Sequence, residues 1–145
     1  MDQQAPFRVA LADWWSDADA IRQVRTAVFV AEQGIPAALE WDGLDADCDH
    51  VLVRAAGGLP VATGRLMADG RIGRMAVLSP WRRRGIGTLL LEALLEQARA
   101  RAMHEVYLHA QVEVAAFYRS AGFVAAGQPF TEAGIRHVSM RCPVG

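Results

Sequence analysis

Apolar and polar positions alternate along the chain in a pattern that predicts short strands and two main helices. A weak period-two alternation from Phe7 to Ala12 indicates a first strand. The stretch after it begins near Ser16 and Asp19, which resemble a capping box, and stops at Gly34. Its apolar residues recur at helical spacing: Ile21, Val24, Val28 and Ala31. We therefore expect a strand followed by a helix.

Three short runs that are typical of strands follow an irregular acidic segment. They read HVLVRA, PVATGRLMA and RIGRMAV. The pairs Gly57-Gly58 and Asp69-Gly70 separate the runs, and their glycines accept the positive φ that tight hairpin turns require. The three runs are therefore predicted to form an antiparallel meander.

The longest helical pattern comes next, within WRRRGIGTLLLEALLEQARAR from Trp81 to Arg101. Its apolar face is predicted to consist of Ile86, Leu89, Leu90, Ala93 and Leu94. The rest of the chain reads as a strand (EVYLHA), a short helix closed by Gly122 (VEVAAFYRSAG) and two extended runs near FVAAG and IRHVSMR. This order predicts an α/β (α+β mixed) fold, in which helices pack on a mixed sheet.

Composition and charge narrow the class of protein. A chain of 145 residues, 52% of them hydrophobic, is long enough for a real core, and we assign residues 1–145 to a single domain. The formal net charge of -1 argues against a protein that coats nucleic acid or an anionic membrane, since both need a surplus of positive charge. Cys48 and Cys142 form no CxxC pair, which argues against a disulfide framework or a zinc cluster. The sequence has neither a secretory leader pattern nor an apolar run of about 18 residues, and we expect a cytoplasmic protein.

Gly85 and Gly87 fall in the first turn of the predicted long helix, where each glycine costs about 1 kcal/mol relative to alanine. Arg82, Arg83 and Arg84 stand directly before them. The first turn of a helix exposes backbone N–H groups without intrahelical partners and carries a partial positive charge. Glycines let a bulky phosphate approach these groups, and arginines add charge and forked donors. The segment is therefore a candidate pyrophosphate site; the alternative is a helix start beside a solvated basic cluster.

Two common phosphate-binding motifs do not match this segment. GxxxxGK[ST] requires a lysine and a Ser or Thr directly after its last glycine, whereas Gly87 is followed by Thr88 and Leu89. GxGxxG requires a third glycine where Leu90 stands. The segment therefore needs a different interpretation.

Two segments of the sequence stand in register with each other. MAVLSPWRRRGIG places a strand, a break and an R-x-x-G-x-G turn in succession. This succession closely resembles the acetyl-CoA signature of the GCN5-related N-acetyltransferase (GNAT) family. QVEVAAFYRSAGF resembles the second signature, a polar residue before a short helix that carries Phe-Tyr and ends in Gly-Phe. RTAVFVAEQGIP with EWDGLDAD, and FTEAGIRHVSM, are similar to the ElaA/YjcF-like branch. The resemblance implies a GNAT-like acyl-CoA N-acyltransferase fold, a mostly antiparallel sheet of about six to seven strands flanked by about four helices.

The resemblance also implies acetyl-CoA as the cofactor and a role for several residues. The strand that ends in Met75, Ala76 and Val77 would hold the pantetheine arm by its backbone and polarise the thioester carbonyl. Tyr118 matches the family's general acid, which touches the cofactor and protonates its thiolate; the alternative is a half-buried tyrosine packed in the short helix. Gln111 would bind the pantetheine or the adenine side, with helix capping as the alternative. The implied pyrophosphate site comprises Arg82, Arg83, Arg84, Gly85, Ile86, Gly87 and Thr88.

The acceptor amine must be unprotonated to attack, so a general base or a water relay is expected. Glu132 and His137 would lie beside the thioester if the last two strands form a hairpin as in the family, although a histidine in a strand is more often structural. Glu32 and Gln33 match an EQ pair of the branch and are expected in the acceptor pocket, with an exposed helix end as the alternative. The remaining histidines show no ligand spacing and receive no role: His50, His104 and His109.

An acidic loop before the meander is a further candidate for the acceptor site. It contains Glu40, Asp42, Asp45, Asp47 and Asp49. Glu40 and Asp42 are candidates to bind a cationic amine, and a solvated surface is the alternative. The spacing Asp45-x-Asp47-x-Asp49 also fits the start of a calcium loop, but His50 occupies the glycine position and Ala56 the position of the bidentate glutamate. We therefore expect no metal site.

These features predict an acetyl-CoA-dependent N-acetyltransferase that acts on a primary amine of a small-molecule or peptidyl acceptor, by direct attack in a ternary complex. The alternative is a non-catalytic domain that binds or senses acyl-CoA. Tyr118 argues for chemistry, and the lack of one defined base keeps the alternative open. A nucleic-acid module would need an interleaved run of aromatic and basic residues, which the sequence lacks. A second copy in a homodimer is a candidate partner, and we expect neither nucleic acid nor a membrane as a partner.

Overall fold

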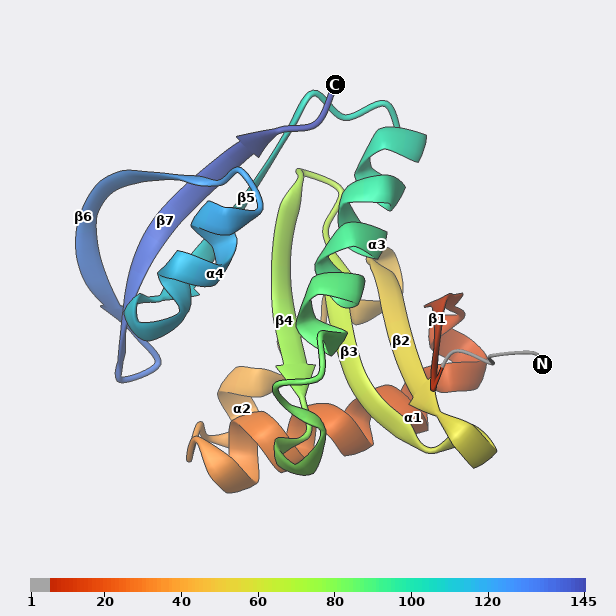
Figure 1. Cartoon of the computed structure of the whole chain (residues 1–145). Coiled ribbons are helices and arrows are strands. Elements are labelled where there is room, and N and C mark those ends of the chain that lie inside the picture. The colour runs from red at the N-terminus through yellow and green to blue at the C-terminus, as the bar shows by residue number, and fades with distance from the viewer. Residues whose placement is uncertain (1–5) are drawn as a thin grey trace.

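The structure is a computed structural model that describes residues 6–145, and it contains one seven-stranded sheet (Figure 1). The strands are β1 (Phe7–Ala12), β2 (Asp49–Ala55), β3 (Pro60–Leu66), β4 (Arg71–Val77), β5 (Glu105–Gln111), β6 (Val124–Glu132) and β7 (Ile135–Pro143). Their order is β1-β2-β3-β4-β5-β7-β6, and all neighbours are antiparallel except β4 and β5. The predicted fold class is confirmed, and β2, β3 and β4 form the predicted meander.

Helices cover both faces of the sheet. The helices are α1 (Trp14–Arg25), α2 (Ala37–Glu40), α3 (Ile86–Ala100) and α4 (Ala115–Ser120), and a π-helical segment, η1 (Thr26–Glu32), continues α1. All seven residues of β3 are buried, because α3 packs on one face of this strand and α1 on the other (Figure 1). In the part of the chain that the structure describes, no helix is long and apolar enough to cross a bilayer.

The start of α1 differs from the predicted capping box. The helix begins at Trp14, and the Asp13 side chain accepts hydrogen bonds from Trp15 N at 3.2 Å and from Ser16 Oγ at 3.1 Å. The box of Ser16 and Asp19 is therefore wrong, because an earlier acidic residue already caps the free N–H groups of the first turn. Gly34 has a φ of +72°, which supports its role as the stop after η1.

The apolar face of α3 is rotated relative to the prediction. The residues that are buried against the sheet are Ile86, Leu90, Leu91, Leu94, Leu95 and Ala98. Leu89 is 39% exposed, so its predicted place on the buried face is wrong. Successive residues of a helix lie about 100° apart, and a face centred on Leu90, Leu91 and Leu94 leaves Leu89 at its margin.

β4 and β5 diverge soon after they pair. Only Arg71 with Tyr107 and Ile72 with Leu108 are in register, so both strands continue without each other as partners. The register between β3 and β4 also shifts in this region, and Arg74 adopts a left-handed φ of +50°. Such bulges bend a strand and redirect its side chains. The result is an opening between two strands in the middle of the sheet.

Candidate active site

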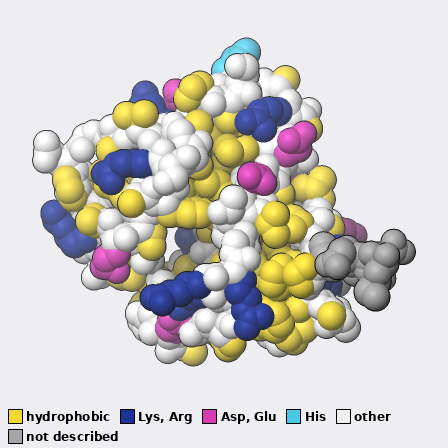
Figure 2. Space-filling view, in the orientation of Figure 1, with side chains coloured by type: hydrophobic (Ala, Val, Ile, Leu, Met, Phe, Trp, Pro, Cys, Tyr) yellow, Lys and Arg dark blue, Asp and Glu magenta, His cyan; other side chains and the backbone are white. Residues whose placement is uncertain are grey.

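The opening between β4 and β5 belongs to a cavity of about 950 Å³. The cavity is bounded by η1, β4, the N-terminus of α3, α4 and the hairpin of β6 and β7. Figure 2 shows positively charged side chains beside the hollow, over the turn that leads into α3. Most of the predicted site residues line it: Glu32, Gln33, Glu40, Met75, Ala76, Val77, Arg82, Arg83, Gly85, Ile86, Gly87, Thr88, Gln111, Tyr118, Glu132 and His137. Two predicted residues, Asp42 and Arg84, are not part of this lining.

The tip of α3 has the properties of an anion site. Gly85 is the N-cap residue with a φ of +80°, a conformation that costs other residues energy, and no side chain caps the helix. A Cβ added at Gly85 would meet no atom within 4 Å, so this glycine faces open space. The free N–H groups of the first turn therefore face room for a diphosphate, and the residues present fit that group.

The three arginines before the helix have different surroundings. Both Nη atoms of Arg82 lie 2.6 Å from the Glu32 carboxylate, and Arg82 Nε donates to Val77 O at 2.9 Å. This hydrogen-bonded pair lowers the pKa of Glu32, and it ties η1 to the turn before α3. Arg84 stacks over the Trp81 ring at 4.9 Å. Arg83, with a left-handed φ of +62°, makes no hydrogen bond or ion pair within residues 6–145 and remains the free cation of the three.

The edge of β4 that faces β5 offers unpaired backbone groups. Alternate residues of a strand turn their N–H and C=O groups toward the same neighbour. From Gly73 to Val77, β5 supplies no strand partner for those groups. An extended ligand placed along β4 would therefore complete the ladder, as an added strand does at a sheet edge.

Tyr118 approaches this edge from α4. Its hydroxyl donates to the thioether sulfur of Met75 at 3.5 Å, and its ring packs against Phe117 and Phe123 at centroid distances of 5.1 and 5.8 Å. Burial raises the pKa of Tyr118 to about 12, so the phenol keeps its proton at neutral pH. The residue is thus both packed among aromatic rings and aimed at β4.

His109, which the sequence interpretation left without a role, lies on the other side of the opening beside Glu132. His109 Nδ1 is 3.0 Å from Glu132 Oε2, and Arg71 Nη2 is 3.1 Å from the same nitrogen and 3.3 Å from Glu132 Oε1. Burial raises the pKa of Glu132, but its hydrogen bond with His109 and the charge of Arg71 outweigh burial and lower it. Alternation in β5 contained the signal for His109: Val106, Leu108 and Ala110 are buried in the core, which turns Tyr107, His109 and Gln111 to the opposite face.

His137 and Gln111 have partners of their own. His137 Nδ1 lies 2.7 Å from the backbone oxygen of Ile135, and its ring stacks on Phe130 at 6.1 Å. Gln111 Nε2 donates to Gln33 Oε1 at 3.0 Å, which connects the end of β5 to the end of η1. The capping alternative for Gln111 is wrong, because its side chain makes no cap hydrogen bond to the short helix that follows.

The acidic loop forms a buried ion-pair cluster with arginines. Arg25 Nε lies 2.7 Å from Glu40 Oε2 and Arg25 Nη1 2.7 Å from Asp45 Oδ1. Glu40 and Asp45 are buried, so a solvated surface is the wrong description of these two residues. Arg65 Nη2 lies 2.9 Å from Asp42 Oδ2; burial raises the pKa of Asp42, but Arg65 hydrogen bonds bring it down to about 2. The acidic charge that was expected to attract an amine is therefore balanced within the protein.

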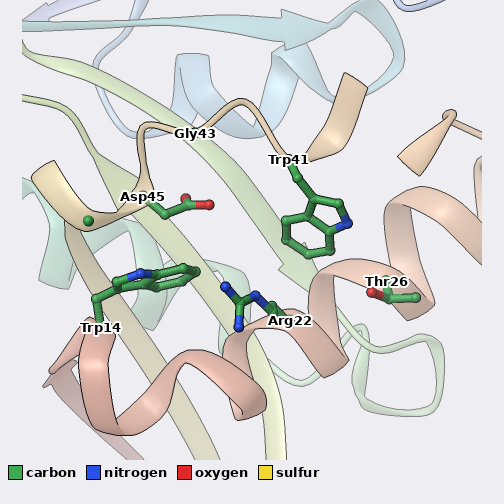
Figure 3. A pocket seen from close by; sticks show the side chains of 7 residues that line it. Trp14, Arg22, Thr26, Trp41, Gly43 and Asp45 are labelled. Carbon is green, nitrogen blue, oxygen red and sulfur yellow. The ribbon is translucent and has the colours of Figure 1, made fainter. Parts of the chain in front are cut away.

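A second cavity of about 590 Å³ includes Asp45 of the ion-pair cluster in its lining, together with Trp14, Arg22 and Trp41 (Figure 3). Two tryptophans form its walls: Trp41 packs against the Arg25 guanidinium at 4.7 Å, and Trp14 stacks on His50 at 4.9 Å. The Trp41 ring thus covers the buried charge of Arg25. We assign the chemistry to the larger cavity, which contains the helix tip, the open strand edge and Tyr118.

Within residues 6–145, no cluster of three or more His, Cys, Asp or Glu side chains has an arrangement that could hold a metal ion. Cys48 and Cys142 are free thiols.

Comparison with known proteins gives consistent results. The model of the acetyltransferase (GNAT) domain matches residues 17–144. The uncharacterized N-acetyltransferase YjcF of Bacillus subtilis is 36% identical over 121 residues, which cover 81% of this chain and 86% of that protein. ElaA of Escherichia coli is 33% identical over 128 residues, 83% of this chain and 84% of ElaA. The crystal structure of an acyl-CoA N-acyltransferase from Pseudomonas aeruginosa superposes with a TM-score of 0.84 at 33% identity and covers 94% of this chain and 99% of that one.

Proposed function

Since the chain belongs to the GNAT family, in the branch of ElaA and YjcF, it is an acyltransferase, and we propose that acetyl-CoA is its donor and a primary amine its acceptor. The amine attacks the thioester directly while both substrates are bound. The observation that carries this proposal is the geometry of the cavity, in which an uncapped helix tip, an unpaired strand edge and the Tyr118 hydroxyl follow one another.

The binding roles follow from the groups at each end of the cavity. N–H groups of the α3 tip, from Gly85 to Thr88, hold the diphosphate, with Arg83 as the free cation. Arg82 supports the diphosphate site through its hydrogen bonds to Glu32, which fix the turn before α3. Arg84, stacked on Trp81, adds positive charge from the rim of the cavity. Backbone groups of Met75, Ala76 and Val77 hold the pantetheine arm, and Gln111 borders it.

The catalytic roles fall to groups on the two sides of the opening. A backbone N–H of β4 stabilises the thioester oxygen when it becomes negative, and losing one such donor typically costs about 3 kcal/mol of barrier. Tyr118 keeps its proton at neutral pH and donates it to the departing sulfur. Glu132 and His137 face the same cavity as candidates for the base that deprotonates the amine. The candidates for the acceptor site remain Glu32, Glu40 and Asp42. They are paired with Arg82, Arg25 and Arg65, respectively.

Thermal unfolding with coenzyme A tests the binding part of the proposal. A ligand at about 100 times its Kd stabilises the folded state by about 2.7 kcal/mol. Gly85→Glu places a carboxylate at the helix tip and is expected to abolish this stabilisation. Gly57→Glu is a matched control, since Gly57 has nearly the same φ of +82° and also faces open space, but lies in the turn between β2 and β3. Equal protection of both variants would refute the placement of the diphosphate.

A spectrophotometric assay of released thiol with a panel of amines tests the chemical part. The chain contains no lysine, so acetylation of its own side-chain amines gives no background. Turnover with at least one amine supports the enzyme, whereas protection by coenzyme A without turnover of any amine supports a sensor of acyl-CoA.

A further inference from the structure

The point where β4 and β5 separate marks one end of the opening. Ile72 and Leu108 form the last pair in register, so Gly73 and His109 are the first residues on either side of the gap. A Cβ added at Gly73 would meet no atom within 4 Å, which leaves free space opposite His109. Val77, at the other end of β4, is about 13 Å from Gly73 at the usual rise per residue of a strand, and the α3 tip lies beyond Val77. A thioester carrier that is anchored at the tip and extended along β4, as in the proposed function, therefore points its acyl end toward His109.

The neighbours of His109 define which of its nitrogens is free. Glu132 is an acceptor when ionised, and its Oε2 lies 3.0 Å from Nδ1, so this contact holds a proton on Nδ1. Arg71 Nη2 lies 3.1 Å from the same Nδ1, but Arg71 can only donate, so it cannot hydrogen-bond to a protonated Nδ1. With the proton shared between Nδ1 and the nearer carboxylate oxygen, Arg71 donates to the second oxygen at 3.3 Å. Phe130 packs edge-on against the imidazole at 5.0 Å and fixes its plane. Nε2 makes no hydrogen bond to any residue in 6–145, which leaves its lone pair available to a ligand in the cavity.

The two other candidates are poorer bases than His109. The Glu132 carboxylate already accepts from two partners, and the lowered pKa makes it a weak base at neutral pH. His137 also directs Nδ1 to an acceptor, the backbone oxygen of Ile135, but it is only 8% exposed and makes no hydrogen bond to a carboxylate within residues 6–145 that would stabilise an imidazolium.

We propose that His109 is the general base of the acetyl transfer, that Glu132 is a positioning residue that orients it, and that the acceptor amine enters from the face opposite Tyr118. The amine nitrogen forms a bond to the acyl carbon, and its proton passes to His109 Nε2. The C–S bond then breaks with its electron pair on sulfur, which takes a proton from Tyr118 Oη. Proton exchange with water restores His109 and Tyr118, and the products are an amide and a thiol. This inference rests on the proposed function and assigns its base.

Opposite faces of the sheet separate the acid from the base. Leu108 and Ala110 of β5 point into the core on the α3 side, where Tyr118 packs, whereas His109 points to the side of η1 and the β6–β7 hairpin. The charged and titratable groups around His109 are Arg71 from β4, Glu132 from β6, His137 from β7 and Tyr107 from its own strand.

The test compares His109→Gln and Glu132→Gln with His104→Gln, an exposed histidine in the loop before β5. The readouts are kcat/KM against pH for an amine that the wild type accepts, and protection from unfolding by coenzyme A. His109→Gln is expected to lower kcat/KM by about 10²- to 10⁴-fold and to remove the acidic limb of the pH profile that belongs to the base, with protection unchanged. Glu132→Gln is expected to lower kcat/KM less and to alter the pH profile, because the imidazole loses the charged partner that orients it through Nδ1. His104→Gln is expected to match the wild type.

Several results would overturn the assignment. A His109→Gln variant with wild-type kcat/KM and an intact acidic limb excludes His109 as the base while the proposed function stands. If Glu132→Gln removes the acidic limb of the pH profile while His109→Gln lowers kcat/KM only slightly, Glu132 is the base itself. Coenzyme A protection of each variant shows whether it has folded. A wild type that binds coenzyme A but turns over no amine refutes the proposed function, and this inference with it.

Discussion

The Tyr118→Phe variant separates catalysis from binding and stability. The substitution removes one oxygen and keeps the ring, whose packing against Phe117 and Phe123 at 5.1 and 5.8 Å does not depend on the hydroxyl. The only protein partner of this hydroxyl in residues 6–145 is the Met75 sulfur at 3.5 Å. A thioether is a weak acceptor, so little binding energy is lost with the oxygen.

The expected magnitudes differ strongly between the two properties. A neutral hydrogen bond contributes about 0.5–1.5 kcal/mol net, and a buried hydroxyl with a weak partner contributes less, so the free energy of unfolding changes by less than about 1 kcal/mol. Loss of a general acid lowers turnover by about 10²- to 10⁴-fold, which is about 3–5 kcal/mol of barrier. Because burial raises the pKa of Tyr118 to about 12, wild-type turnover is not lost through deprotonation of this phenol at any pH below about 11.

The assay measures kcat with an accepted amine, coenzyme A affinity by thermal shift, and unfolding in urea. Tyr107→Phe is the matched control, since the Tyr107 hydroxyl donates to Asp69 at 2.5 Å on the surface of the molecule. We expect wild-type turnover for the control and a large loss for Tyr118→Phe at nearly unchanged affinity. Equal turnover of Tyr118→Phe and wild type, or a loss of affinity as large as the loss of turnover, would refute the assignment of the acid.

Three further changes test the packing around the site. Arg25→Met removes the fully buried arginine that Glu40 and Asp45 share and leaves each carboxylate with one other arginine partner, and it is expected to cost about 3–5 kcal/mol in urea unfolding. A change below about 1 kcal/mol would contradict the importance of the ion-pair cluster. Burial raises the pKa of Asp42, but its arginine partners outweigh burial and lower this pKa from 3.8 to about 2. The contribution of Asp42 to the free energy of unfolding is therefore present above pH 3.8 and is lost as the pH falls to 2. Asp42→Asn should flatten this part of the curve of stability against pH, and an unchanged slope would argue against the ion pair. Gly64→Ala places a Cβ 2.8 Å from Leu94 Cδ1 in a packed core and is expected to cost about 1–3 kcal/mol by the same measurement, whereas a stabilised variant would show that β3 and α3 can separate.

Local pattern was sufficient for the elements that local rules control. The turns at Gly57-Gly58 and Gly70 have the positive φ that the hairpins required, and α3 begins directly after Gly85. Alternation and helical spacing depend on burial of one face, which the sequence displays directly. The start of α1 failed because Asp13 competes with Ser16 for the same cap, and spacing alone does not rank them.

Contacts between distant segments could not be predicted in this way. The pair of His109 and Glu132 depends on the order β5-β7-β6, in which the end of β6 lies one strand away from β5, across β7, and that order is not encoded in either motif. The bond between Arg82 and Glu32 joins residues 50 positions apart, so the three arginines looked alike in sequence. In the structure Arg82 is paired, Arg84 stacks on Trp81, and Arg83 makes no hydrogen bond or ion pair within residues 6–145. The acidic loop looked solvated for the same reason, since its arginine partners lie in α1, β3 and β4.

A crystal structure of the chain with coenzyme A bound tests the central claim most directly. The account predicts a diphosphate at the N–H groups of the α3 tip around Gly85 and Gly87, a pantetheine arm that hydrogen-bonds along Met75 to Val77, and a sulfur near the Tyr118 hydroxyl. A diphosphate bound elsewhere, or an opening between β4 and β5 that stays empty at saturating coenzyme A, would contradict it.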